Sequence, residues 1–211
     1  ASKVVIAAEP VEDTIFPGLR VDVSVFGRFQ AYRLAAELQR LGSLGTLFTS
    51  YPKQVADVDR RHLYNPWHLK TLEAVCARAL PSLIPRETIW AHFADRFDRG
   101  VADRLKAAAP GEIPAIHGWA SHSLATLRRA KSLGYRTFLE SACPHPIFKE
   151  RLLSEEARRV GADFRTSRSW VDRVNAECDA ADRIVVPSRY SRDSFLQLGF
   201  PEERLLTVPL G

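Results

Sequence analysis

The stretch ADRIVVPSRYSRDSFLQLGFPEERLLTVPLG, residues 181–211, decides the fold. Its apolar, β-branched run at Arg183–Val186 is typical of a buried strand. Ser188 is a favoured N-cap for a helix that Gly199 would end, and Arg204–Val208 then resembles a second short strand. The stretch therefore predicts a strand–helix–strand unit at the end of an α/β domain.

The same alternation of strands and helices continues toward the N-terminus. The further strands that we predict are Val4–Ala8, Gly45–Thr49, Ile113–Ile116 and Arg136–Leu139. The further helices are Phe29–Leu41, Pro66–Leu80, Glu87–Ala108, Ser121–Leu133, Pro146–Val160 and Trp170–Ala180. Val4–Ala8 is apolar throughout, as a central strand should be, and Pro10–Gly27 is expected to be a polar loop. Residues 1–211 thus predict one Rossmann-like, three-layer α/β domain with a mainly parallel sheet.

The composition is that of a soluble globular protein. The chain has 211 residues, of which 45% are hydrophobic and 26% charged, and no apolar run is long enough to span a membrane. No signal-peptide cleavage site follows the first apolar run, so we expect a cytoplasmic location. The three cysteines Cys76, Cys143 and Cys178 have neither disulfide nor metal spacing, and small buried side chains are their simplest interpretation.

The net charge of +5 leaves the class of partner open. It would suit nucleic acid, anionic lipid headgroups or phosphorylated substrates, but the arginines are scattered and no nucleic-acid motif occurs. We therefore expect no nucleic acid. Basic helices with exposed aromatic residues suggest peripheral contact with the inner face of the membrane.

The closing stretch carries a resemblance to a known family. Its pattern, AD-R-I-V-V-P-S-x-x-S-R-D-x-F-x-x-x-G-F-P-x-E-R-L-x-x-V-P-L-G, is similar to the inter-domain segment of the GT4-type retaining glycosyltransferases, which have the GT-B fold. The resemblance implies that the chain is the N-terminal, acceptor-side half of such an enzyme, ending at the interdomain hinge. A donor-binding domain would follow Gly211.

The resemblance also implies a reaction. A hexosyltransferase-like enzyme of polysaccharide biosynthesis would transfer a sugar from a nucleotide-sugar to a glycan or lipid-linked acceptor, with retention of configuration. It would need no metal or other cofactor, and this half alone is expected to be inactive. The region Lys53–Ala109 is either an excursion that faces the acceptor or an ordinary pair of helices packed on the sheet.

Candidate site residues follow the predicted strands, where ligands bind in open α/β sheets. Gly27 and Arg28 precede a helix whose free amides would attract phosphate or hydroxyl oxygens, and the resemblance places this turn beside the donor. A turn that serves only the fold is the alternative. In the predicted turn His117-Gly118-Trp119, the histidine matches the first position of the family's H-x-H element. Trp119 replaces the second histidine and could stack on a sugar.

Two further loops complete the candidate set. Glu140 and Ser141 begin ESACPHP, which is similar to a strand end in some GT4 members and implies contacts with sugar hydroxyls. Local capping and turn formation explain these residues equally well. Ser188 beside Arg189 starts a helix that could hold an anion, although N-capping explains Ser188. We expect His122 to lie in the helix after the His117 turn.

Other enzyme classes lack their motifs here. The sequence has no G-x-S-x-G elbow, no H-E-x-x-H or comparable metal spacing and no P-loop lysine motif. Two hypotheses remain: the acceptor-binding half of a retaining glycosyltransferase, and a non-catalytic α/β binding or scaffold domain. The first predicts that the native gene continues into a nucleotide-binding domain.

Overall fold

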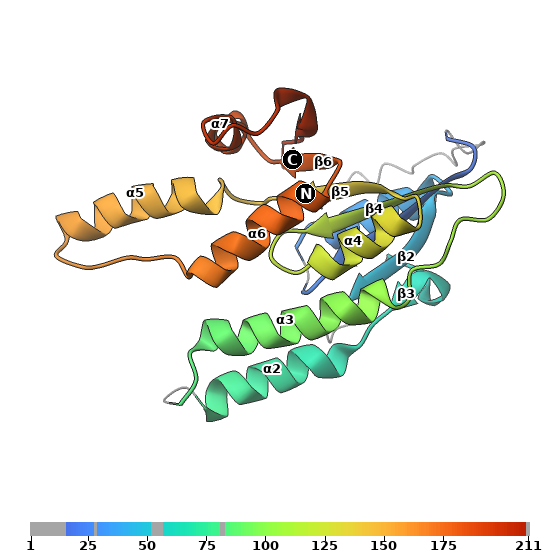
Figure 1. Ribbon diagram of the computed structural model, residues 1–211. Coiled ribbons are helices and arrows are strands. Elements are labelled where there is room, and N and C mark those ends of the chain that lie inside the picture. Colours follow the sequence, from blue (N-terminus) through green and yellow to red (C-terminus); the bar gives the residue numbers. More distant parts are fainter. Residues whose placement is uncertain (1–15, 28, 52–56, 81–82, 210–211) are drawn as a thin grey trace, which may run out of the picture.

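The computed structural model describes residues 16–27, 29–51, 57–80 and 83–209 (Figure 1). Its centre is a parallel sheet of seven strands in the order β3-β2-β1-β4-β5-β6-β7. The strands are β1 (Leu19–Val25), β2 (Leu44–Thr49), β3 (Leu63–Tyr64), β4 (Ile113–Trp119), β5 (Arg136–Glu140), β6 (Arg183–Val186) and β7 (Leu205–Thr207). The helices are α1 (Ala31–Arg40), α2 (Trp67–Ala79), α3 (Arg86–Ala102), α4 (Leu124–Ser132), α5 (Pro146–Arg159), α6 (Arg168–Ala180) and α7 (Arg189–Leu196).

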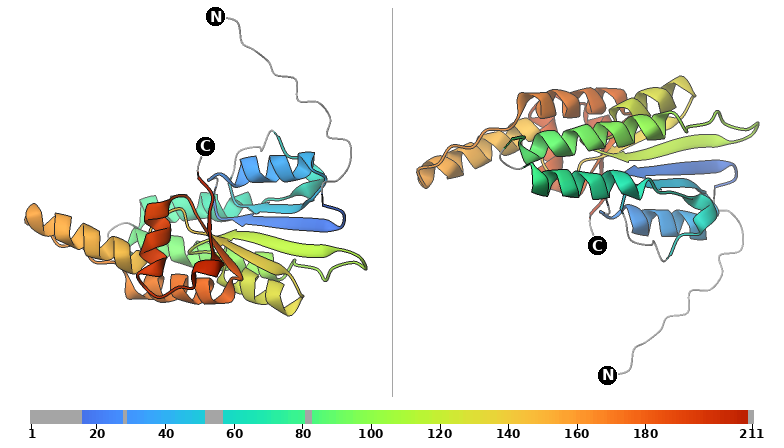
Figure 2. Two further views of the ribbon diagram at one scale, coloured as in Figure 1. Left: turned by 90° about the horizontal axis from the view of Figure 1, so that it is seen from above. Right: turned by 90° about the horizontal axis from the view of Figure 1, so that it is seen from below.

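The helices form two layers around the sheet. Helix α1 covers β1 and β2 on one face, and Figure 2 shows α4 and α6 on the opposite face. Helix α3 packs on α4 in that second layer, and α2 packs on α3. The fold is therefore the Rossmann-like, three-layer α/β domain that the alternating pattern predicts.

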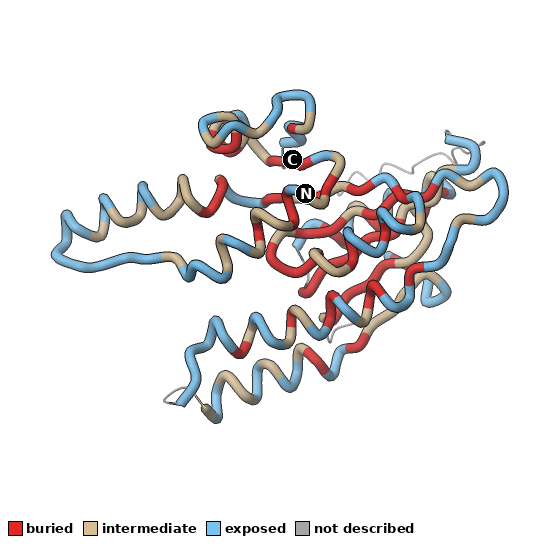
Figure 3. The backbone as a smooth tube through the Cα atoms, in the orientation of Figure 1, coloured by how far each residue is buried: buried red, intermediate tan, exposed pale blue. Residues whose placement is uncertain are grey.

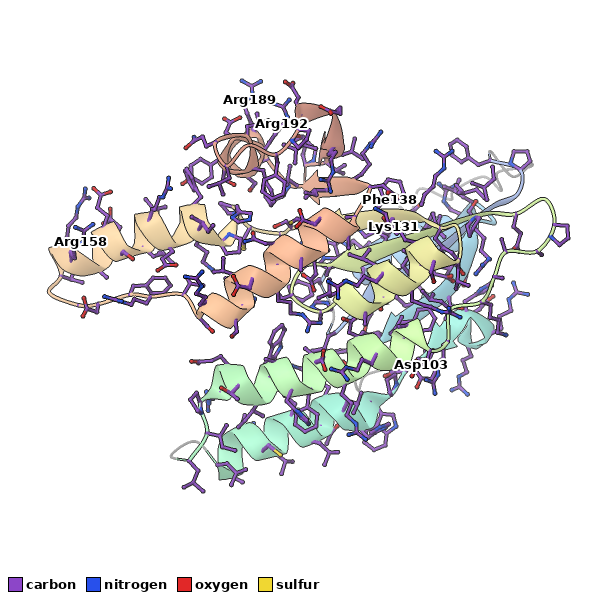
Figure 4. All side chains as sticks on the ribbon, viewed as in Figure 1. Asp103, Lys131, Phe138, Arg158, Arg189 and Arg192 are labelled. Carbon is purple, nitrogen blue, oxygen red and sulfur yellow. The ribbon has the colours of Figure 1, made fainter. Side chains whose placement is uncertain are left out.

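Each face of the sheet has its own apolar core. The smaller core lies under α1, and its members are Val23, Val25, Ala31, Ala35, Leu44, Leu47, Val58 and Trp119. The larger core joins α3, α4, α6 and α7 to the other face through residues such as Phe97, Leu127 and Ile184. In Figure 3 buried residues follow the strands, whereas α5 is almost entirely intermediate or exposed and the chain joining it to α6 is mostly exposed. These two segments extend away from the sheet, with Arg158 near the far end of α5 (Figure 4).

The closing strand–helix–strand unit has the predicted form. The Ser188 hydroxyl accepts a hydrogen bond from the Ser191 amide at 3.1 Å and so caps α7. After the helix, Gly199 has a φ of +85°, which a glycine adopts without strain. Strand β7 then pairs with β6 at the edge of the sheet.

The prediction that Pro10–Gly27 is a loop is wrong. Within this segment β1 pairs with both β2 and β4 and is a central strand. Its sequence alternates apolar with polar residues, and the polar members Asp22 and Ser24 are nevertheless buried. Asp22 is satisfied by the Thr46 amide at 2.7 Å and by Arg20 at 2.9 Å. The expected central strand Val4–Ala8 lies outside the described residues.

The predicted turn His117-Gly118-Trp119 is also wrong, because β4 continues to Trp119 and pairs with β5 along that length. Helix α4 begins only at Leu124, so His122 lies in the connection before the helix rather than within it. Helix α3 likewise ends at Ala102, six residues before the predicted end at Ala108.

Two buried carboxylates fix the connection between β4 and α4. Asp98 on α3 accepts hydrogen bonds from the amides of Ala125 and Thr126 at 2.9 and 2.8 Å. Glu177 on α6 accepts from the amide of Ser123 at 2.8 Å and from that of Ser121. The amides of Ser123, Ala125 and Thr126 lie at the N-cap and in the first turn of α4, where they would otherwise lack partners, so α3 and α6 together define where α4 starts.

Gly118 is needed for close packing at this connection. A Cβ atom added to Gly118 would lie 2.6 Å from the Ser123 hydroxyl, whereas one added to Gly100 on α3 would meet nothing closer than 3.9 Å. We expect Gly118→Ala to destabilise the protein by about 1–3 kcal/mol, as overpacking does. Gly100→Ala should instead stabilise it by about 0.5–1 kcal/mol, since alanine favours a helix. Urea denaturation measures both, and equal effects of the two substitutions would contradict the packing argument.

Stability should also depend on the ionisation of Glu177. Burial raises the pKa of this carboxyl from 4.5 to about 7, although the two amides and Arg173 partly offset the effect. Because the pKa is raised on folding, the stabilising contribution is full below pH 4.5 and is lost as the pH rises to about 7. The loss should be about 3 kcal/mol. It can be measured as the difference in free energy of unfolding between the wild type and Glu177→Gln across this pH range. The exposed control Glu203→Gln should show no such trend, and a constant difference for Glu177→Gln would refute the assignment.

Candidate active site

A cavity of about 730 Å³ opens at the carboxyl edge of the sheet. Strand β1 lies between β2 and β4, so the chain adds strands on one side of β1 and then on the other. This reversal creates the crevice in which open α/β sheets bind ligands. The cavity is lined by the start of α1, by β4, β5 and β6, and by Val208 and Pro209 after β7.

His117 and Glu140 form a pair in the wall of this cavity. His117 on β4 and Glu140 on β5 point to the same face of the sheet, and His117 Nε2 lies 3.0 Å from Glu140 Oε2. A carboxylate accepts hydrogen bonds, so Nε2 carries a proton toward Glu140, and in the tautomer with this single ring proton Nδ1 is an acceptor. The ring lies parallel to that of Phe138, its neighbour on β5.

Trp119 lines the same cavity two residues further along β4. Its ring centroid is 4.8 Å from that of His117. The side chain is 2% exposed, and its indole Nε1–H has no acceptor among the described residues. A buried donor without a partner costs about 1–3 kcal/mol.

The turn between β1 and α1 forms the opposite part of the lining. Gly27 has a φ of +132° and Phe29 a φ of +38°, so this turn is tight and glycine is needed at its start. Phe29 and Gln30 line the cavity, whereas Gly27 is not among the lining residues. Arg28 lies outside the described residues. The sequence therefore located the turn correctly, but the residues that reach the cavity follow the glycine.

Ser141 does not join this group. It is buried, and its hydroxyl donates to the Cys143 carbonyl at 2.9 Å, which is the local turn contact considered as its alternative role. Ser188 likewise serves as an N-cap, and Arg189 is an exposed residue of α7 (Figure 4). His145 is held by Asn175 at 2.9 Å, and burial lowers its pKa.

Sequence reasoning missed several residues of the lining. Arg33, in the first turn of α1, is exposed and brings a guanidinium to the cavity. Tyr32 and Leu34 line it as well, and Pro187 and Val208 come from the closing stretch. Their spacing in the sequence carries no signal, because the sheet order alone brings the end of β6 beside α1.

Other kinds of site find little support among the described residues. No group of three or more histidine, cysteine, aspartate or glutamate side chains could hold a metal ion within the part that the structure describes. Within the same residues, no helix has the length and apolar character needed to cross a membrane. Cys178 is buried, Cys76 is half-buried and Cys143 is exposed.

Comparisons with known proteins do not assign a family. No protein-family model matches this chain, and no curated protein sequence is significantly similar to it. The resemblance of the closing stretch to GT4-type enzymes therefore rests on its own residues.

The cysteines provide a simple test of the packing of the larger core, to which Cys178 belongs. Burial raises the pKa of the Cys178 thiol to about 12, so almost no thiolate is present near neutral pH. Iodoacetamide should modify exposed Cys143 in the native protein and reach Cys178 only after unfolding. Peptide mass spectrometry measures both rates, and equal labelling of the two residues in the native state would contradict the described packing.

Proposed function

We propose that this chain is the acceptor-binding, N-terminal half of a GT-B, GT4-type retaining glycosyltransferase. The observation that carries the proposal is the cavity at the strand-order reversal. There the paired His117 and Glu140, the Trp119 ring beside them and the end of the closing stretch come together. A sugar supplies hydroxyl groups that both donate and accept hydrogen bonds, so it matches such a mixed set.

Each residue has a role in the proposed reaction. Glu140 holds the His117 ring with Nε2 protonated, so that Nδ1 can accept a hydrogen bond from a sugar hydroxyl. Trp119 packs against the His117 ring and supports it in the cavity wall. Arg33 and the first amides of α1 add positive potential, where they would face a diphosphate leaving group.

The proposal assigns nucleotide binding to another domain, because among the described residues this cavity has too few basic side chains for it. The cavity is open on one side, and its lining offers Arg33 as its only arginine or lysine among the described residues, which is too little to hold a nucleotide diphosphate. A domain beyond Gly211 would bind the nucleotide-sugar, close this side and exclude water during transfer. No metal is part of the proposal. The protein would work in the cytoplasm, in contact with the inner face of the membrane if its acceptor is lipid-linked.

Replacing His117 in the product of the complete native gene tests the proposal. We expect His117→Ala to lower kcat by about 100-fold or more, because the substitution removes a hydrogen bond made at the reacting sugar. Release of nucleotide from a panel of nucleotide-sugars measures the rate. His92→Ala, an exposed histidine on α3, is the matched control and should leave the rate unchanged. An unaltered rate for His117→Ala would remove this residue from the site. Absence of transfer with every donor would favour the alternative, a non-catalytic binding or scaffold domain.

A further inference from the structure

A second cavity lies on the opposite face of the sheet, and nothing above gives it a role. It measures about 840 Å³ and is bordered by α2, by the first turns of α3 and α6, and by Ser121. Figure 1 shows the start of α6 beside the start of α3. Trp119 lines the first cavity and Ser121 the second, so both cavities border the same end of β4.

Two indole rings line this second cavity, and each is held in place. Trp170 on α6 donates from Nε1 to the Ser121 hydroxyl at 2.8 Å. Trp90 on α3 makes edge contacts with Phe26 and with the buried His122, at ring-centroid distances of 6.1 and 6.2 Å. Both tryptophans remain half-buried, so part of each ring faces the cavity. Fixed aromatic faces of this kind pack against the C–H face of a ring-shaped ligand.

The charge at the cavity favours an anion. Arg86 and Arg165 line it, are exposed and make no hydrogen bond or ion pair among the described residues. Arg173 also lines the cavity, but its guanidinium is bound by Asp95, Asp98 and Glu177. Glu73 is paired with Lys70 at 2.6 Å, which leaves Glu87 as the remaining free carboxylate among the described lining residues. Two free guanidinium groups against one carboxylate suit a ligand with a single anionic group.

The uncharged polar side chains of the described lining, apart from the tryptophans, carry hydroxyl groups. Ser121, Ser167, Ser169 and Thr88 can each donate and accept, as sugar hydroxyls do, and no asparagine or glutamine is present among the described lining residues to read the edge of a nucleobase. Ser121 also has a φ of +83°, an uncommon conformation for a residue with a side chain. It is held there by Glu177 and Trp170. Such strain is often retained at functional sites.

We propose that this second cavity binds a sugar that carries one carboxylate or phosphate group. The ring would lie against Trp90 and Trp170, its hydroxyls would meet the serines, and Arg86 and Arg165 would hold the anion. The binding site stands on its own residues. Because both cavities border the end of β4, this site would hold an anionic unit of the acceptor. That role rests on the proposed function.

Calorimetry with the chain itself tests the inference, using glucose 6-phosphate, glucuronate, glucose, inorganic phosphate and adenosine monophosphate as probes. The two anionic sugars should bind, with glucose and inorganic phosphate at least about tenfold weaker, because each lacks one of the two recognised groups. Adenosine monophosphate binding as tightly as glucose 6-phosphate would overturn the assignment to a sugar. Inorganic phosphate binding equally tightly would reduce the cavity to a general anion site, and no binding of either anionic sugar would refute it.

Matched variants locate the binding. Trp170→Ala and Arg165→Gln should each weaken binding of glucose 6-phosphate about tenfold or more. Arg165 is exposed, so its substitution tests the site even if Trp170→Ala fails to fold. Trp67→Ala and Arg128→Gln replace exposed residues outside the cavity and should leave binding unchanged. If the control variants weaken binding as much, the ligand binds elsewhere and the inference fails.

One further comparison separates a lipid-borne ligand from a free one. The choice of measurement separates this inference from the proposed function. Co-sedimentation with phosphatidylinositol vesicles, whose headgroup is a cyclic polyol that carries a phosphate, against phosphatidylcholine alone, distinguishes binding of such a group on a lipid from binding of a free sugar phosphate. Because every measurement here is of binding, the site can be confirmed when no glycosyl transfer is found. Conversely, transfer that depends on His117 can be confirmed when this cavity proves empty.

Discussion

The rest of the structure depends on the hydrogen bonds that Asp98 and Glu177 accept from the backbone at the start of α4. Two carboxylates on different helices hold one connection, and Arg173 joins them through ion pairs of 2.7 and 3.3 Å. Removing one member would leave a buried charge without its partner, at a cost of about 3–5 kcal/mol. This connection follows directly on β4, so the positions of α3, α4 and α6 and the end of β4 are set together.

Both candidate sites follow from this constraint. On the α1 face, the last residues of β4 present His117 and Trp119 to the first cavity. On the other face, Glu177 holds Ser121, and Ser121 in turn anchors the Trp170 ring at the second cavity. Sites on opposite faces of one strand end can bind different parts of an extended ligand without competing for the same side chains. A glycan acceptor is such a ligand, which is why the two proposals are physically compatible.

The sequence was most informative where apolar residues run continuously or where a cap is present. Arg183–Val186 and Ser188 gave the closing unit correctly, and β2 and β5 were expected within one residue of their bounds. It failed at β1, because Asp22 and Ser24 look like loop residues, and the partners of Asp22, which are Thr46 and Arg20, become apparent only in the fold. Of the candidate site residues, His117, Trp119 and Glu140 line the first cavity, whereas Ser141 turns away into a local contact.

The sequence by itself determined most of the strands and helices, and with them the class of fold, since hydrophobic periodicity and capping act over a few residues. Only the tertiary structure decided which strands are neighbours and which face each side chain takes. The pairing of His117 with Glu140 depends on the register between β4 and β5, and the second cavity depends on α3 and α6 meeting near Ser121. Such contacts join residues more than twenty positions apart, and the free energy that fixes them comes from the packed sheet and the buried carboxylates rather than from any local pattern.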